Sequence, residues 1–273
     1  MCHGDGLRCV AVNAQLRVLP ERIPHEDPMT DPNAAPPAAP EKAGLIEDFV
    51  DIFTSPSAVF TRRANASALL PWLIVSALLV LMLVVNRNIM AGITDAMMNK
   101  GFAAAAKANP NVTAEQMASS RGMMENFGLV SQIIGVPIGL LVVGLFTWII
   151  GKIFGATFSY GTALMVTSFA WIPRVVEQVL LSVQGLVIDT STFTSPYQVS
   201  LGAMRFMDSA TMHPALVGVL SRLDIITIWV VFLTATGLVY AGKMERKKMM
   251  LAAVVIWLVG TLPAIYGAFK AVG

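Results

Sequence analysis

The sequence predicts an all-α integral membrane protein, a bundle of five transmembrane helices with a disordered N-terminal tail. Of the 273 residues, 55% are hydrophobic and only 13% are charged, whereas an ordinary soluble domain is about 25% charged. The apolar residues stand in long charge-free blocks instead of alternating with polar ones. Roughly 20 such residues in a helix cross a hydrocarbon core about 30 Å thick, and a helix pairs its own backbone groups there.

Residues 1–42 are predicted to form a disordered cytoplasmic tail. Residues 31–40 are mostly proline and alanine, a composition that builds no core and favours extended conformations. The composition changes at Met29, and we therefore expect residues 1–28 to be dispensable or never made. The alternative is a metal site among three residues before this point, although their spacing matches no strong pattern: Cys2, His3 and Cys9.

Residues 43–63 are predicted to form two amphipathic cytoplasmic helices. Ser55 followed by Pro56 signals the start of the second helix. The first helix lies on the membrane surface, docks a partner or packs on the bundle. We favour packing on the bundle, because anionic lipid would repel its acidic face. Its apolar face consists of Leu45, Ile46, Phe49, Val50 and Phe53. Its acidic face consists of Glu47, Asp48 and Asp51.

The transmembrane domain is predicted at residues 64–270. Lysines and arginines gather before the first span and in the second and fourth connections. This bias places the N-terminus in the cytoplasm and the C-terminus outside, and we expect a bacterial inner membrane. The five charge-poor blocks give spans at about 66–86, 129–151, 160–187, 224–242 and 249–269.

Two connections between the spans are long. Residues 87–125 are rich in methionine and are interpreted as a loop, with a helix starting at Thr113, which has capping-box spacing to Gln116. Methionine sulfurs could bind copper(I), but methionine is more often adaptable apolar filler. Residues 189–222 turn apolar near their end, which indicates a helix on the outer surface.

Four glycines of the second span are predicted to let helices approach closely. The spacing Gly135-x-x-x-Gly139 and Gly151-x-x-x-Gly155 puts small residues on one face. Packing within the chain is our preferred interpretation, and packing between two copies, which would make a homo-oligomer, is the alternative.

Two charges interrupt the third span and mark a candidate intramembrane polar site. Arg174 and Glu177 are three residues apart, so they are neighbours on one helix face. Charges inside a span cost at least about 2.5–3.5 kcal/mol each, so they avoid lipid. Pro173 kinks the helix and frees a carbonyl for Arg174. The site serves either as a structural ion pair or as a place for a substrate, an ion or a hinge.

Enzymatic and nucleic-acid functions find no support in the sequence. Motifs of metalloproteases, serine hydrolases and phosphate- or dinucleotide-binding loops are absent, and so are motifs of nucleic-acid binding. We predict no catalytic residue, cofactor or metal. The expected partners are the lipid bilayer and an unidentified protein.

Three stretches of the chain carry a family resemblance over about residues 44–270. They are Glu47-Asp-Phe-Val-Asp-Ile-Phe-Thr-Ser-Pro56, Tyr160-Gly-Thr-Ala-Leu with Ala170-Trp-Ile-Pro173, and Asp224-Ile-Ile-Thr-Ile-Trp229 followed by Gly237-Leu and Lys243-Met-Glu-Arg-Lys-Lys248. In this order they resemble the Yip (Ypt-interacting protein) domain family, in its bacterial branch. The resemblance implies five spans, a cytoplasmic N-terminus and no catalysis. Eukaryotic members bind Rab-type GTPases, but their Asp-Leu-Tyr-Gly-Pro motif is absent here.

The predicted function is therefore a non-enzymatic membrane protein that organises the membrane or recruits partners. The alternative is a small-solute or ion transporter that uses the polar site of the third span. Transporters commonly consist of two repeated halves, and five spans do not divide equally.

Overall fold

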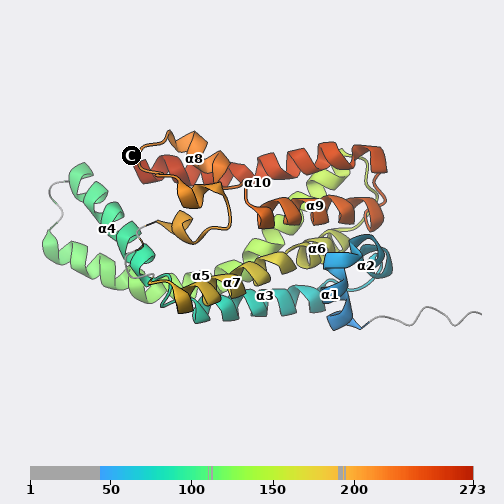
Figure 1. Ribbon diagram of the computed structural model, residues 1–273, viewed down its shortest axis with the longest axis horizontal. Coiled ribbons are helices and arrows are strands. Elements are labelled where there is room, and N and C mark those ends of the chain that lie inside the picture. Colours follow the sequence, from blue (N-terminus) through green and yellow to red (C-terminus); the bar gives the residue numbers. More distant parts are fainter. Residues whose placement is uncertain (1–43, 110, 112, 190–192, 194, 273) are drawn as a thin grey trace, which may run out of the picture. The chain divides into compact units, whose positions relative to one another are not determined.

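The computed structural model describes residues 44–109, 111, 113–189, 193 and 195–272 (Figure 1). The tail at residues 1–42, with the expected start at Met29, lies outside them. The described part holds no β-strand, and one isolated bridge joins Gly202 to Asp224. The helices are α1 Leu45–Thr54, α2 Pro56–Arg63, α3 Leu69–Val85, α4 Ala91–Ala108, α5 Ala114–Ile153, α6 Tyr160–Ala170, α7 Ile172–Val187, α8 Pro214–Leu220, α9 Ile225–Tyr240 and α10 Met249–Val272, with short 3-10 helices at Pro196–Val199, Ala203–Phe206 and Arg246–Lys248.

The helices form a membrane bundle. By length and composition, three helical stretches among the described residues can cross a membrane, namely Glu115–Ile153, Tyr160–Val187 and Arg246–Lys270. The apolar helices α3 and α9 are shorter. Only 11% of the most apolar part of Arg246–Lys270 is buried inside the structure. Large apolar side chains thus face outward, as contact with lipid requires.

Helix α6 forms the centre of the bundle. All of its residues from Ala163 to Ala170 are buried, and it packs against α3, α5 and α9. Its Phe169 and Met165 share one apolar core with Val75 of α3 and Leu233 of α9. The site residues therefore stand on a rigid scaffold.

The third predicted span is broken in the middle. Helix α6 ends at Ala170, and α7 begins at Ile172 with Pro173 in its first turn. Proline is tolerated there, because a first-turn residue has no intrahelical partner for its N–H. The break at Trp171 sets Arg174 at the start of a new helix.

The long loop predicted at residues 87–125 is wrong in its first part, where α4 forms. The run Ala103–Ala106 explains the difference, because alanine has the highest helix propensity. The predicted capping box is confirmed at the start of α5. The Gln116 N–H donates to Thr113 Oγ1 at 3.2 Å, and the Thr113 N–H donates to Gln116 Oε1 at 3.0 Å. Helix α5 thus extends well beyond its predicted span.

Helix α8 forms in the connection where a helix was expected. It packs closely on α10. A Cβ atom added to Gly218 would lie 2.5 Å from the Ile265 Cα, so only glycine fits this contact.

Helices α1 and α2 form as expected, but the faces of α1 differ from the prediction. Asp48 is fully buried, although it was assigned to a solvated acidic face. Leu45, Phe49 and Ile52 pack on the core, and the Phe49 and Phe169 rings lie 5.3 Å apart. The rest of the predicted apolar face is exposed. In Figure 1, α1 runs across the direction of α3.

Candidate functional site

The predicted polar site lies where α7 packs beside α9. Arg174 Nη1 donates to Glu177 Oε2 at 2.7 Å, and Arg174 Nη2 donates to Thr227 Oγ1 at 2.6 Å. The side chains of Arg174 and Glu177 are only 16% and 23% exposed. The carbonyl freed by Pro173 was the expected acceptor, but the guanidinium of Arg174 donates to two side chains among the described residues. The guanidinium thus ties α7 to α9.

Asp224 and Thr227 extend this site, and the sequence-based prediction missed both. The Thr227 N–H donates to Asp224 Oδ1 at 2.7 Å, and the Thr227 hydroxyl donates to Asp224 Oδ2. Asp224 is therefore the N-cap of α9. An aspartate just before an apolar run is a helix-start signal, and this signal could have found it.

Arg222 adds a fourth charge to the group. It lies near enough to interact electrostatically with Arg174, Asp224 and Glu177. Its Nε atom is buried and has no hydrogen-bond partner among the described residues. The Trp257 indole of α10 donates to the Arg222 carbonyl at 3.0 Å. Two cations and two anions thus form one balanced cluster, which joins α7, α9 and α10.

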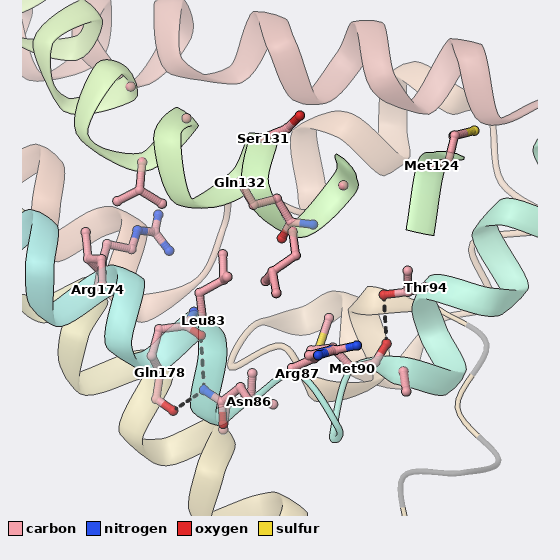
Figure 2. Close-up of a pocket in the computed structure, with 18 of the residues that line it drawn as sticks. Leu83, Asn86, Arg87, Met90, Thr94, Met124, Ser131, Gln132, Arg174 and Gln178 are labelled. Atoms are coloured by element: carbon pink, nitrogen blue, oxygen red, sulfur yellow. Dashed lines mark hydrogen bonds between the residues drawn. The ribbon is translucent and has the colours of Figure 1, made fainter. Parts of the chain in front are cut away.

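A cavity of about 1180 Å³ lies between α3, α4, α5 and α7. Arg174 reaches it from one side, and Arg87 lies beside Met90 at another (Figure 2). On the wall, the Asn86 amide donates to the Gln178 carbonyl at 2.9 Å. Met98 and Met124 also line the cavity. Methionines thus serve as wall residues, the interpretation preferred over copper binding.

The four glycines of α5 fall into two groups. Gly135 and Gly139 line the cavity, and an added Cβ would meet no heavy atom within 4 Å. No side chain or backbone of the described residues therefore packs closely on these two glycines. Close packing at Gly135 and Gly139 remains a prediction for contact with a second molecule. A Cβ on Gly151 would lie 2.5 Å from the Phe158 ring. Gly155 has a φ of +84° and ends the helix.

A second charged cluster joins α1 to α2. Arg62 and Arg63 both donate to the buried Asp48 carboxylate, and Arg62 Nη2 also donates to Asp51 Oδ2 at 2.7 Å. These carboxylates, Asp51 first, raise the pKa of Arg62 above its ordinary value. Arginine is charged throughout the physiological range in any environment of this kind, so these bonds to α1 do not depend on pH there.

No group of three or more His, Cys, Asp or Glu side chains that could hold a metal occurs in the described ranges. The tail residues Cys2, His3 and Cys9 lie outside them.

The sequence profile of the Yip1 domain matches residues 50–267. The chain belongs to the Yip1 domain family. The membrane protein YknW of Bacillus subtilis (strain 168) is 24% identical to this Yip1 domain protein over 207 residues, which cover 76% of this chain and 83% of YknW. No solved structure matches the chain. The resemblance to the bacterial branch is thereby confirmed.

The Yip1 match covers both the polar cluster and the cavity. It begins within α1 at Val50 and ends within α10 at Gly267. The Yip1 domain family is not a known enzyme family. The site is thus part of the domain itself.

Proposed function

We propose that this Yip1 domain protein organises the bilayer without catalysis, and that α1 lies in the membrane interface. The observation that supports this proposal is a second apolar stripe on α1. Ile46 is 80% exposed and Val50 65% exposed, and Phe53 next to them is exposed as well. Large apolar residues at this spacing on one helix face fit an amphipathic helix that inserts into the headgroup region.

The stripe lies on the flank of α1 that faces away from α2. Successive residues are about 100° apart around a helix. Ile46, Val50 and Phe53 therefore lie beside the buried stripe of Leu45, Phe49 and Ile52, so the two make one wide apolar face. The opposite flank carries Asp48 and Asp51, which bind the arginines of α2. The contacts with α2 thus hold α1 so that its exposed flank is apolar.

The charges at this end of the bundle favour anionic lipid. The acidic face of α1 was the reason to expect repulsion, but α2 neutralises two of its three carboxylates. The described residues at this end hold seven basic side chains and four acidic ones. Basic residues beside a span are attracted to anionic lipid. They are Arg62, Arg63, Lys152, Lys243, Arg246, Lys247 and Lys248, against Glu47, Asp48, Asp51 and Glu245.

Five spans, with the N-terminus in the cytoplasm of a bacterium and the C-terminus outside, complete this proposal. At 1.5 Å per residue, the 17 residues of α3 and the 16 of α9 extend over about 26 Å and 24 Å. A membrane adjusts to spans a few ångströms short by local thinning. Neither the family description nor the name of YknW mentions transport, so the transporter alternative is not favoured.

The depth of α1 can be measured with single spin labels on the full chain. Cys2 and Cys9 are its only cysteines and are replaced by serine. Ile46→Cys, on the exposed stripe, and Glu47→Cys, on the polar flank, then carry one label each in vesicles of phosphatidylglycerol and phosphatidylcholine. We expect oxygen, which concentrates in lipid, to reach the label at residue 46 better than a water-soluble nickel chelate does. The label at residue 47 should show the reverse.

If the nickel chelate reaches both labels equally, α1 does not contact lipid and the proposal is overturned. If neither reagent reaches residue 46, a protein covers the stripe, and partner recruitment replaces the lipid interface.

The organising role predicts an effect on vesicle size. An apolar stripe inserted into one leaflet expands that leaflet, so wild-type protein should give smaller vesicles than a variant with Ile46→Ser, Val50→Ser and Phe53→Ser. Glu47→Gln, on the polar flank, is the matched control and should behave as wild type. Equal vesicle diameters for wild type and the triple variant, measured by electron cryomicroscopy, contradict the role.

A further inference from the structure

We propose that the cavity between α3, α4, α5 and α7 binds an anionic phospholipid. Its phosphate would lie at Arg87, and its acyl chains would lie along the inner wall. This site is separate from α1, because its lining residues on α3 lie towards the end of that helix away from α2. The inference therefore does not depend on the proposed role of α1.

The lining holds charged residues at the C-terminal end of α3 and mostly apolar ones deeper along the helix, where Arg174 is engaged by Glu177 and Thr227. At the C-terminal end of α3, the wall holds Arg87, with Asp95 and Arg121 near it in the lining. One to two turns further along α3, the wall is formed by Leu83 and Leu79. The facing wall of α5 ends in Val136, Leu140 and Val143. A phosphate suits the first region, and acyl chains suit the second.

The charge of the lining favours an anion. Three arginines and one aspartate line the cavity. Arg121 lies 3.6 Å from Asp95, and Arg174 is held by Glu177. No hydrogen bond or ion pair to another described residue occupies the Arg87 guanidinium. Arg87 is thus available for a phosphate, and basic pockets between transmembrane helices bind lipid headgroups in this way.

The size of the cavity and the glycines in its wall fit a lipid better than a small solute. Its volume of about 1180 Å³ exceeds the roughly 300–1,000 Å³ of pockets for drug-sized ligands. Gly128, Gly135 and Gly139 put no side chain into the cavity at three positions of α5, and Gln132 between them points into it (Figure 2). A flexible chain can lie along the glycine positions and bend around Gln132.

Two pairs of variants test the site by native mass spectrometry of the full-length protein in detergent. The probes are phosphatidylglycerol, phosphatidylcholine and inorganic phosphate. Arg87→Gln should weaken phosphatidylglycerol binding at least about tenfold, the effect of one lost hydrogen bond between charged groups. Lys100→Gln removes an exposed charge of α4 that does not line the cavity, and it should have no effect.

The second pair fills the cavity. Gly139→Leu places a side chain in open space, so the fold should persist while phosphatidylglycerol is excluded. Gly122→Leu is the matched control, because Gly122 also lies in α5, has open space around it and does not line the cavity.

Four results would overturn the proposal. Phosphatidylcholine could bind as tightly as phosphatidylglycerol, with Arg87→Gln weakening the binding of neither lipid. Inorganic phosphate could displace phosphatidylglycerol at equal concentration, which would make a free anion the ligand. Phosphatidylglycerol could bind Gly139→Leu as it binds wild type. Finally, Gly139→Leu could convert a dimer to a monomer without changing lipid binding, which would place a second copy of the chain in the cavity.

Discussion

The charged side chains near the core gather where burial makes an unpaired charge costly. Arg174 and Glu177 share a hydrogen bond beside α9, and Asp48 holds two arginines of α2. In both places the charges of one helix are balanced by groups on the same helix or on its neighbour. Removing one member therefore leaves the other without compensation, and the resulting change in stability measures its burial.

The ion pair of Arg174 and Glu177 predicts that a double substitution restores stability lost in the single variants. Arg174→Met and Glu177→Leu should each lower the free energy of unfolding by about 3 kcal/mol, the lower end for a buried pair, because both side chains keep some exposure. The double variant should regain most of this loss, as judged from thermal unfolding in detergent. Full stability with lost biological activity in the double variant would instead indicate a functional site.

The exposed pair of Lys247 and Glu245 is the matched control for this measurement. Lys247 is 79% exposed, so Lys247→Gln should leave the free energy of unfolding nearly unchanged, because water screens such a pair. Single variants of Arg174 and Glu177 as stable as this control would mean that neither charge is buried.

Asp48→Asn is expected to loosen α1 from α2. The substitution leaves Arg62 and Arg63 facing an uncharged amide, so the local free energy of opening α1 should fall by about 3 kcal/mol. This is the lower end for a buried pair, because both arginines keep contact with water. Hydrogen exchange of the α1 amides should then be roughly a hundredfold faster, with α9 unchanged. Glu47→Gln, at an exposed position of α1, should leave the exchange rates as they are. Unchanged rates in Asp48→Asn would show that the cluster does not hold α1.

At the scale of whole elements, α5 performs two tasks along its length. Residues between Arg121 and Val143 line the cavity, where glycines meet no neighbour, and the last turns pack against the bundle. The glycine spacing alone does not separate these tasks, because a residue that meets a glycine can come from a distant part of the chain. Leu238 of α9, which would lie 2.9 Å from a Cβ on Gly151, is an example.

Alanine at two positions of α5 should therefore have opposite effects. Gly151→Ala should destabilise the protein, because its Cβ would lie 2.5 Å from the Phe158 ring. Gly135→Ala should raise the free energy of unfolding by about 0.5–1 kcal/mol, since alanine restricts the unfolded chain and nothing opposes the Cβ. Thermal unfolding of both variants checks the prediction. Equal destabilisation by both would mean that Gly135 is also packed.

At the scale of the molecule, the sequence predicted the membrane class and most helices, but not their contacts. Charge-free blocks indicate α5, α6 and α10 directly, and Ser55-Pro56 indicates α2. The alanine-rich α4 was missed because Asp95, Lys100 and Lys107 divide its apolar residues, so it forms no charge-free block. Asp224 was assigned to the edge of a span, although it caps α9 and closes the polar cluster. Asp48 was assigned to solvent, because its partners in α2 meet it only after the chain turns. The cavity has no sequence signal, since four separate segments form it.

The central claim is a five-span Yip1 domain protein with α1 on the cytoplasmic side, and its topology tests this claim most directly. Reporter fusions made after five residues should read outside, inside, outside, inside and outside in chain order. The basic residues before α3 and in the second and fourth connections support this order. An inside reading at the C-terminus, or two successive fusions on the same side, would contradict it. The fusion points are Glu125, Lys152, Asp208, Lys247 and Gly273.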